Sequence, residues 1–280
     1  MSEHKTDIII IGAGPVGLFA VFELGLLDMK CHLIDNLDKI GGQCSELYPE
    51  KPIYDIPSRV TISAQELVDD LMEQCRPFNP VFHLGQNAET LEKNSSNEWI
   101  VTTSEGNVII AKCIVIAAGA GSFIPRKPPL ENIENYENKS VFYAIKNKDI
   151  FRNKKVLIAG GGDSAVDWTN ELSKISEVSL IHRRKEFRAA PDSVEKMLEL
   201  EKNKTIHFHI GQLKTLHGND GKLKYVTVYN GEKESKIETD FLIPLFGLKT
   251  DLGQIVNWNL ELQNNLILVD TEKFETNIKR

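Results

Sequence analysis

The chain has 280 residues, of which 41% are hydrophobic and 26% charged, which is ordinary for a globular protein with buried cores. Its formal net charge of −7 argues against general nucleic-acid binding. No apolar run reaches membrane-spanning length, and the first residues lead into a predicted strand without a signal-peptide pattern, so we expect a cytoplasmic protein.

A strand–turn–helix–strand unit opens the chain. A predicted strand over Asp7–Ile11 meets the turn GAGPVG, and a helix and a second strand follow. In such units the first glycine makes the tight turn, the second lets the backbone approach a pyrophosphate, and the third lets the helix pack closely on the strand. The helix N-terminus then holds the anion. The residues concerned are Gly12, Gly14, Pro15 and Gly17.

Asp35 ends the second strand of this unit, 23 residues after Gly12 (35 − 12). An acidic side chain at this place accepts hydrogen bonds from ribose hydroxyls and repels a 2′-phosphate. The unit therefore predicts a site for the AMP half of FAD, or for NAD.

The next elements, in chain order, begin with a glycine-containing loop at Gly41-Gly42-Gln43. Ser63 and Glu66 form a capping box that starts a helix through about Arg76. Apolar segments then predict a short strand, a hairpin and a fully apolar strand, at Val81–Leu84, Trp99–Thr103 with Val108–Ala111, and Cys113–Ala118.

A second unit of the same type follows. The apolar run Val156–Ala159 meets the turn GGGDSA, and after a helix the run Val178–Ile181 ends in a basic segment. Two such turns in one chain, each placed between a strand and a helix, favour nucleotide binding over purely structural glycines. The candidate residues of the turn are Gly160, Gly162, Asp163, Ser164 and Ala165.

The basic segment replaces the acidic residue of the first unit. His182, Arg183 and Arg184 stand at the end of the second strand, and Arg188 follows. Guanidinium groups suit a 2′-phosphate, so this unit predicts NADPH. The alternative interpretation is a solvated basic surface.

The second half repeats the plan of the first. A helix over about Ser193–Lys202, a strand at Ile206–Ile210, a hairpin around 219–221 and an apolar strand at Phe241–Leu245 follow the second unit. We therefore predict an α/β fold of two Rossmann-like three-layer dinucleotide-binding domains, an FAD domain with an NADPH domain inserted in it. The expected ranges are 1–117 with 249–280 for the FAD domain, and 118–248 for the NADPH domain.

We expect no redox or metal site at the cysteines or at two histidines of the second half. Cys31, Cys44, Cys75 and Cys113 form no CxxC pair, which excludes the usual local redox disulfide and zinc pairs, so each is expected to be a small buried apolar residue. His207 and His209 alternate on a strand without a nearby carboxylate or cysteine, and we expect no metal there.

With both turns in hand, the chain resembles the low-molecular-weight thioredoxin reductase family over nearly its whole length. Within that family it looks most like the thioredoxin-reductase-like ferredoxin–NADP reductases of bacteria. The motifs that carry the resemblance are the Gly12–Gly17 turn, Gly41-Gly42-Gln43 with residues 47–51, residues 123–127, Gly160–Asp167, and His182–Arg184 with residues 187–189.

The resemblance implies an activity and its partners. Thioredoxin reductases carry a CxxC pair before the second turn, but Val141–Lys155 contains no cysteine, so electrons must leave the flavin by another route. In the similar reductases they pass from NADPH through FAD to ferredoxin, with flavodoxin as the alternative acceptor, in a homodimeric enzyme. Hydride and electron transfer need no acid or base from the protein, so we name no catalytic side chain.

The resemblance also implies FAD contacts. Asp35 is expected at the adenosine ribose, Gln43 at the ribityl or pyrophosphate group, Ala88 at the adenine, and Phe123 against the flavin. Tyr48 is expected to stack on the isoalloxazine, because an aromatic face can cover the ring and exclude water. The alternative for Tyr48 is a core tyrosine or a loop anchor.

A basic surface for an acidic ferredoxin has candidates in Arg126, Lys127, Lys146, Lys148, Arg152, Lys154 and Lys155. A solvated run of surface charges is an equal alternative.

The chain ends at Arg280, before the Gly-Asp motif and tail that the family places after this segment. We expect either a shortened product of a longer protein or a weakened flavin site. The competing functions are an NADPH diaphorase acting on flavodoxin, quinone or free flavin, and a truncated, non-catalytic NADPH-binding protein.

Overall fold

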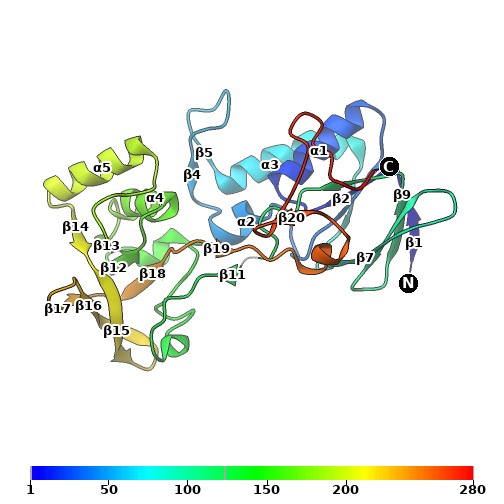
Figure 1. Ribbon diagram of the computed structural model, residues 1–280. Helices are drawn as coiled ribbons and strands as arrows, with labels where there is room; N and C mark the ends of the chain where they lie inside the picture. The colour runs from blue at the N-terminus through cyan, green and yellow to red at the C-terminus, as the bar shows by residue number, and fades with distance from the viewer. Residues whose placement is uncertain (1, 123, 280) are drawn as a thin grey trace. The chain divides into compact units, whose positions relative to one another are not determined.

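A computed structural model describes residues 2–122 and 124–279. It divides the chain into two compact units, Met1–Ile124 with Lys249–Arg280, and Pro125–Leu248, so that the second is inserted in the first (Figure 1). The ranges expected from the sequence assigned residues 118–124 to the inserted domain instead. Two short strands carry the chain between the units and pair with each other, β11 (Ile124–Pro125) and β19 (Leu248–Lys249).

The centre of the first unit is a parallel sheet in the order β10-β2-β3-β6. Its second strand consists of four isoleucines, all buried, because both faces of the sheet are covered. Ile8 and Ile10 pack into a cluster with two helices, whereas Ile9 and Ile11 pack against a second sheet. The elements are β2 (Ile8–Ile11), β3 (Cys31–Ile34), β6 (Val81–His83), β10 (Cys113–Ile116), α1 (Pro15–Leu26) and α3 (Ala64–Cys75).

The third layer of this unit is the sheet β1-β9-β8-β7. Its predicted hairpin is confirmed, since β8 and β9 pair antiparallel in register from Trp99 opposite Ala111. The capping box is confirmed as well: Ser63 Oγ accepts from Glu66 N at 3.2 Å, and Ser63 N donates to Glu66 Oε2 at 2.8 Å. The strands are β1 (Glu3–Lys5), β7 (Ala88–Lys93), β8 (Trp99–Thr103) and β9 (Val108–Ala111).

The second unit repeats this architecture. Its parallel sheet has the order β14-β13-β12-β18, and a three-stranded antiparallel sheet, β15-β16-β17, shares its buried cluster. The predicted repetition of one layout is thereby confirmed. The elements are β12 (Lys155–Ala159), α4 (Asp163–Leu172), β13 (Glu177–His182), α5 (Pro191–Lys202), β14 (Ile206–Ile210), β15 (Gln212–Asn219), β16 (Lys222–Tyr229), β17 (Glu234–Glu238) and β18 (Phe241–Pro244).

After β19 the chain adds a segment to the first unit. Leu252, Ile255 and Trp258 enter the cluster that holds Ile9 and Ile11, and Trp258 Nε1 donates to the Glu89 carbonyl at 3.3 Å. The remaining short elements of this unit are α2 (Gln43–Leu47), β4 (Pro52–Ile53), β5 (Ile62–Ser63), β20 (Leu262–Gln263), β21 (Leu266–Ile267) and the 3₁₀ turns η1 (Arg76–Phe78) and η4 (Gly253–Asn257). The 3₁₀ turns η2 (Ile133–Asn135) and η3 (Lys148–Phe151) belong to the second unit.

No helix within residues 2–122 and 124–279 is long and apolar enough to cross a bilayer. The four cysteines are free; Cys31, Cys44 and Cys75 are buried as expected, and Cys113 is half-buried.

Candidate functional site

The first glycine turn is shaped by the protein's own backbone. Gly12 has φ +109°, and a Cβ there would lie 2.4 Å from the Ala117 carbonyl oxygen, at the end of the neighbouring strand. A Cβ on Gly17 would lie 2.0 Å from the Gly12 oxygen. Gly14, by contrast, has free space, with its nearest neighbour at 3.8 Å. The first and third glycines are therefore required by packing, and the second leaves its backbone accessible to a ligand.

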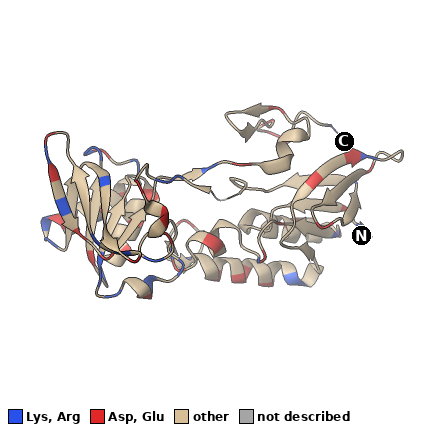
Figure 2. Cartoon of the chain, turned by 90° about the horizontal axis from the view of Figure 1, so that it is seen from below, with Lys and Arg blue, Asp and Glu red and all other residues tan. Residues whose placement is uncertain are grey.

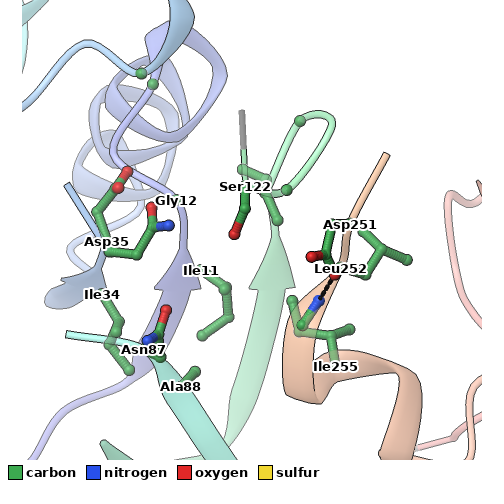
Figure 3. Close-up of a pocket in the computed structure, with 18 of the residues that line it drawn as sticks. Ile11, Gly12, Ile34, Asp35, Asn87, Ala88, Ser122, Asp251, Leu252 and Ile255 are labelled. Carbon is green, nitrogen blue, oxygen red and sulfur yellow. Dashed lines mark hydrogen bonds between the residues drawn. The ribbon is translucent and has the colours of Figure 1, made fainter. Parts of the chain in front are cut away.

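Asp35 lies beside this turn and is held rigidly. Its carboxylate accepts from Ala13 N at 2.6 Å and from Leu37 N at 2.9 Å, and the residue is 9% exposed. Each oxygen of an ionised carboxylate has a further lone pair, so the group can still accept hydroxyl hydrogen bonds. The turn and the carboxylate thus form a fixed acceptor next to an open helix N-terminus (Figure 3).

A pocket of about 520 Å³ extends from the turn across the first unit. Seven residues predicted from the sequence line it, and they come from the first glycine turn, the end of β3, the α2 segment and the start of β7: Gly12, Gly14, Pro15, Asp35, Gln43, Tyr48 and Ala88. Phe123 lies outside the described residues. The structure therefore brings together the described candidate residues of the first site.

The pocket also has a wall that sequence reasoning missed. Asp251, Leu252 and Ile255 line it opposite Ala88, together with Ser122 (Figure 3). Backbone pairing holds this wall, since Ser122 N donates to the Asp251 oxygen at 2.9 Å. The available signal was the spacing of apolar residues at 252, 255 and 258 directly after the chain's expected return to the first domain.

Tyr48 lies at the boundary between the first unit's core and the pocket. Its ring packs on the first unit's core and also lines the pocket. Burial, with Cys44 beside it, raises the pKa of Tyr48 to about 12, so the phenol stays neutral at physiological pH. A neutral aromatic surface of this kind can cover a flat ring.

The second glycine turn has the same backbone design. Gly160 has φ +156°, and a Cβ there would lie 2.6 Å from the Leu245 oxygen, again at the end of the adjacent strand. Ala165 is buried against the turn, while Gly162 has nothing within 4 Å and precedes α4, whose first turn exposes Ser164. A second pocket, of about 710 Å³, opens at this helix N-terminus.

The basic residues lie around the second pocket. His182, Arg183, Arg184 and Arg188 all line it, and the three arginines are exposed. Burial, opposed by a backbone hydrogen bond and supported by the neighbouring arginines, lowers the pKa of His182, which keeps its imidazole neutral at pH 7. Glu186 lines the pocket as well, but Arg183, Arg184 and Arg188 outnumber it, so the site presents net positive charge, which suits a phosphate.

Two hydrogen bonds tie the basic loop, residues 183–190, to the turn. Arg188 N donates to the Gly161 oxygen and Ala190 N donates to Asp163 Oδ1, both at 2.8 Å. Asp163 is a candidate cofactor contact, but one of its carboxylate oxygens already accepts a hydrogen bond from the protein's own backbone.

The candidate ferredoxin surface has its positive charges partly paired. Figure 2 shows acidic and basic residues interspersed along the chain. Ion pairs with carboxylates favour the alternative of an ordinary charged surface: Lys127 contacts Glu137 at 2.6 Å, Arg152 contacts Asp149 at 2.5 Å, and Lys155 contacts Glu238 at 2.5 Å. Within the described part of the chain, no three His, Cys, Asp or Glu residues are arranged to hold a metal.

Comparisons with known proteins agree with this geometry. The pyridine nucleotide-disulphide oxidoreductase family matches residues 6–280. The chain is 58% identical over 273 residues to a protein of Parvibaculum lavamentivorans named ferredoxin–NADP reductase, covering 97% of this chain and 80% of the relative. A relative of the same name from Nitrobacter winogradskyi is 54% identical over 281 residues, covering 99% and 82%.

Solved structures show the same fold. The thioredoxin reductase of Lactococcus lactis superposes with a TM-score of 0.83 at 24% identity, covering 98% of this chain and 87% of that one. The thioredoxin reductase of T. acidophilum gives 0.84 at 19% identity, covering 98% and 88%.

Proposed function

Because the chain belongs to the pyridine nucleotide-disulphide oxidoreductase family, we propose that it is an NADPH-dependent flavoprotein that passes electrons through FAD to ferredoxin. The observation that carries the proposal is the pairing of two nucleotide turns with opposite charges at their ends, Asp35 in the first and Arg183-Arg184 in the second. Relatives 52–58% identical over nearly the whole chain bear the name ferredoxin–NADP reductase.

The first pocket fits FAD. A Cβ on Gly42 would lie 3.1 Å from the Gly14 Cα, so the two bare backbones form a cradle that side chains would fill. The pyrophosphate would lie at this cradle and the α1 N-terminus, with Gly12, Pro15 and Gly17 shaping the turn. Asp35 would accept from the adenosine ribose, Ala88 would meet the adenine, and Gln43 and Tyr48 would contact the ribityl chain and the flavin ring.

The second pocket fits NADPH. Gly160, Gly162, Ser164 and Ala165 would hold its pyrophosphate at the α4 N-terminus. His182, Arg183, Arg184 and Arg188 would surround the 2′-phosphate, which NADH lacks. Opposite charges at the ends of the two second strands thus direct each nucleotide to its own unit.

When bound, FAD supplies the redox chemistry, since it accepts a hydride from NADPH and releases single electrons. The chain's own residues bind, orient and shield the two nucleotides. The cysteines lie at positions 31, 44, 75 and 113, all within the first unit and all free, so the inserted unit has no thiol pair to carry electrons to a disulfide. This supports an external one-electron acceptor.

Two further points belong to the proposal. Homodimerisation follows the expectation from the resemblance and is tested by sedimentation equilibrium. A cytoplasmic location agrees with four free cysteines, since disulfides are rare in that compartment.

The test is the visible spectrum of the purified chain, followed by anaerobic reduction with NADPH and a panel of acceptors. We expect a flavin spectrum that bleaches with NADPH and electron transfer to ferredoxin, with slower turnover of quinone or free flavin. A preference for quinone or free flavin would favour the diaphorase alternative. A colourless protein that still binds NADPH would contradict the proposal, as would equal efficiency with NADH.

A further inference from the structure

Asp163 is an acidic side chain at the place where the proposed function puts a phosphate. It is the first residue of α4, directly after Gly162, at the helix N-terminus where the second pocket opens. A carboxylate there is favourable for the helix dipole of the free protein. It repels an incoming phosphate, however, because like charges close together raise each other's energy. A direct contact with a phosphate therefore does not explain this residue.

The hydrogen bonding of Asp163 gives another role. Its Oδ1 accepts from Ala190 N at 2.8 Å. Ala190 is the last residue before Pro191, which begins α5, so this bond joins the N-termini of the two helices. It also fixes the far end of the basic loop, whose near end follows directly on His182, the last residue of β13.

The middle of the loop is held by separate contacts. Arg188 N donates to the Gly161 oxygen at 2.8 Å. The Phe187 ring lies between His182 and Phe208, with ring centroids 5.4 and 5.3 Å away. The arginines themselves are exposed, so the order of their backbone decides how much conformational entropy a bound phosphate must remove.

We infer that Asp163 is a positioning residue for NADPH selectivity: its carboxylate holds the basic loop at the second glycine turn, so that Arg183, Arg184 and Arg188 are ready to receive the 2′-phosphate. This inference rests on the proposed function of the second pocket. It predicts an effect on ligands that carry a 2′-phosphate and none on ligands that lack it.

The test uses two small probes, 2′,5′-ADP and 5′-AMP, with binding to the full chain measured by calorimetry. Asp163→Ala removes the acceptor, whereas Asp163→Asn removes the charge and keeps an oxygen that can accept from Ala190 N. Asp192→Ala is the matched control, since it removes another first-turn carboxylate, that of α5, which pairs with Lys196 instead of holding the loop.

We expect Asp163→Ala to weaken 2′,5′-ADP about tenfold, in line with the loss of a hydrogen bond to a charged group. Binding of 5′-AMP should stay unchanged. Asp163→Asn should bind 2′,5′-ADP as well as the parent or better, and Asp192→Ala should match the parent. The same split should appear as a raised KM for NADPH at constant kcat.

Three results would overturn the inference. They are an unchanged affinity of Asp163→Ala for 2′,5′-ADP, an affinity of Asp163→Asn as low as that of the alanine variant, and equal losses of affinity for 2′,5′-ADP and 5′-AMP in Asp163→Ala. If Asp163→Ala fails to fold, Ala190→Pro removes the donor of the same bond at a φ of −54°, which proline accepts, and must reproduce the selective loss. A parent chain that binds 2′,5′-ADP no better than 5′-AMP would instead refute the proposed function of the pocket.

Discussion

At the first glycine turn the group that follows the second strand is buried and fixed, whereas at the second turn the corresponding groups are exposed. Asp35 is 9% exposed and accepts two backbone hydrogen bonds. Arg183 and Arg184 extend into solvent from a loop whose backbone alone is tied down. Both turns nevertheless have the same backbone geometry, in which the first glycine packs closely against a carbonyl at the end of a neighbouring strand.

The difference teaches how one supersecondary unit serves two purposes. A pre-organised acceptor inside a pocket lowers the ordering cost of binding and suits a ligand that stays. Flexible cations at a surface gain their affinity from charge and release the ligand readily, which suits a substrate that must exchange. We therefore expect substitutions at the first turn to change stability and cofactor retention, and those at the second to change the KM.

The largest effects should come from the first glycine of each turn. Gly12→Ala and Gly160→Ala place a Cβ 2.4 and 2.6 Å from a carbonyl oxygen, so each should lower the free energy of unfolding by about 3 kcal/mol. Gly14→Ala and Gly162→Ala are the matched controls, because the space at both positions is open. Urea unfolding measures the free energy of unfolding of all four variants. Equal losses of that free energy at the control positions and at the clashing positions would show that the close approach of the first glycine to the neighbouring strand does not hold the turns.

Asp35→Asn should have the next largest effect: it should lower the free energy of unfolding by about 2 kcal/mol, and the variant should lose FAD on gel filtration. Asparagine keeps one acceptor, but its amide nitrogen then faces a backbone N–H, either that of Ala13 or that of Leu37. Asp163→Asn is the comparison in the second unit, where the carboxylate accepts from Ala190 N and the loop is exposed, and it should be nearly neutral for stability. Retention of FAD by the Asp35 variant would contradict the view of a built-in anchor.

The same contrast explains what the sequence could predict. Both turns, their strands and the capping box are local patterns, in which the glycines, the apolar runs and the Ser63–Glu66 pair lie within a few residues of one another. The repetition of the layout in the second half could also be predicted, because the elements that follow each turn recur in the same sequence order. The charges at Asp35 and Arg183 stand at a fixed distance from each turn, so their location could also be read from the sequence.

The missed parts of the site depend on contacts between distant segments. Leu252 and Ile255 join Ala88 only because the chain returns to the first unit after about 120 residues. Asp163 was predicted to contact a cofactor, and its hydrogen bond to Ala190 spans 27 residues and depends on where α5 begins. No local pattern contains such a pairing.

The arginines should give a smaller effect, confined to binding. Arg183→Ala with Arg184→Ala should raise the KM for NADPH about tenfold, equivalent to about 1.4 kcal/mol, and leave the KM for NADH unchanged. Because both side chains are exposed, the free energy of unfolding should change by less than about 0.5 kcal/mol. Equal changes in the KM for NADPH and for NADH would refute the 2′-phosphate assignment. A large loss of stability would show that these arginines, like Asp35, help to hold the fold.

The smallest expected effect is a pH dependence located in the first unit. His4, His32 and His83 come from β1, β3 and β6, and their ring centroids lie 5.1–5.5 Å apart. Burial, with the other two imidazoles beside it, lowers the pKa of His32 to about 4, and burial with His4 beside it lowers that of His83. His32 is therefore neutral in the folded protein at pH values where the unfolded chain, near 6.5, takes up a proton.

The sign follows from that order of pKa values. The contribution of His32 to stability is complete above pH 6.5 and is lost as the pH falls from 6.5 toward 4. Allowing for partial exposure, we expect the free energy of unfolding to fall by about 1 kcal/mol between pH 7 and pH 5. His32→Gln should reduce this loss without abolishing it, because His83 keeps its lowered pKa, whereas His217→Gln, in the β15 strand of the second unit, should leave the loss at its full size. Urea unfolding of the parent and both variants at pH 7 and pH 5 measures the loss, and an undiminished loss in His32→Gln would place the acid sensitivity elsewhere.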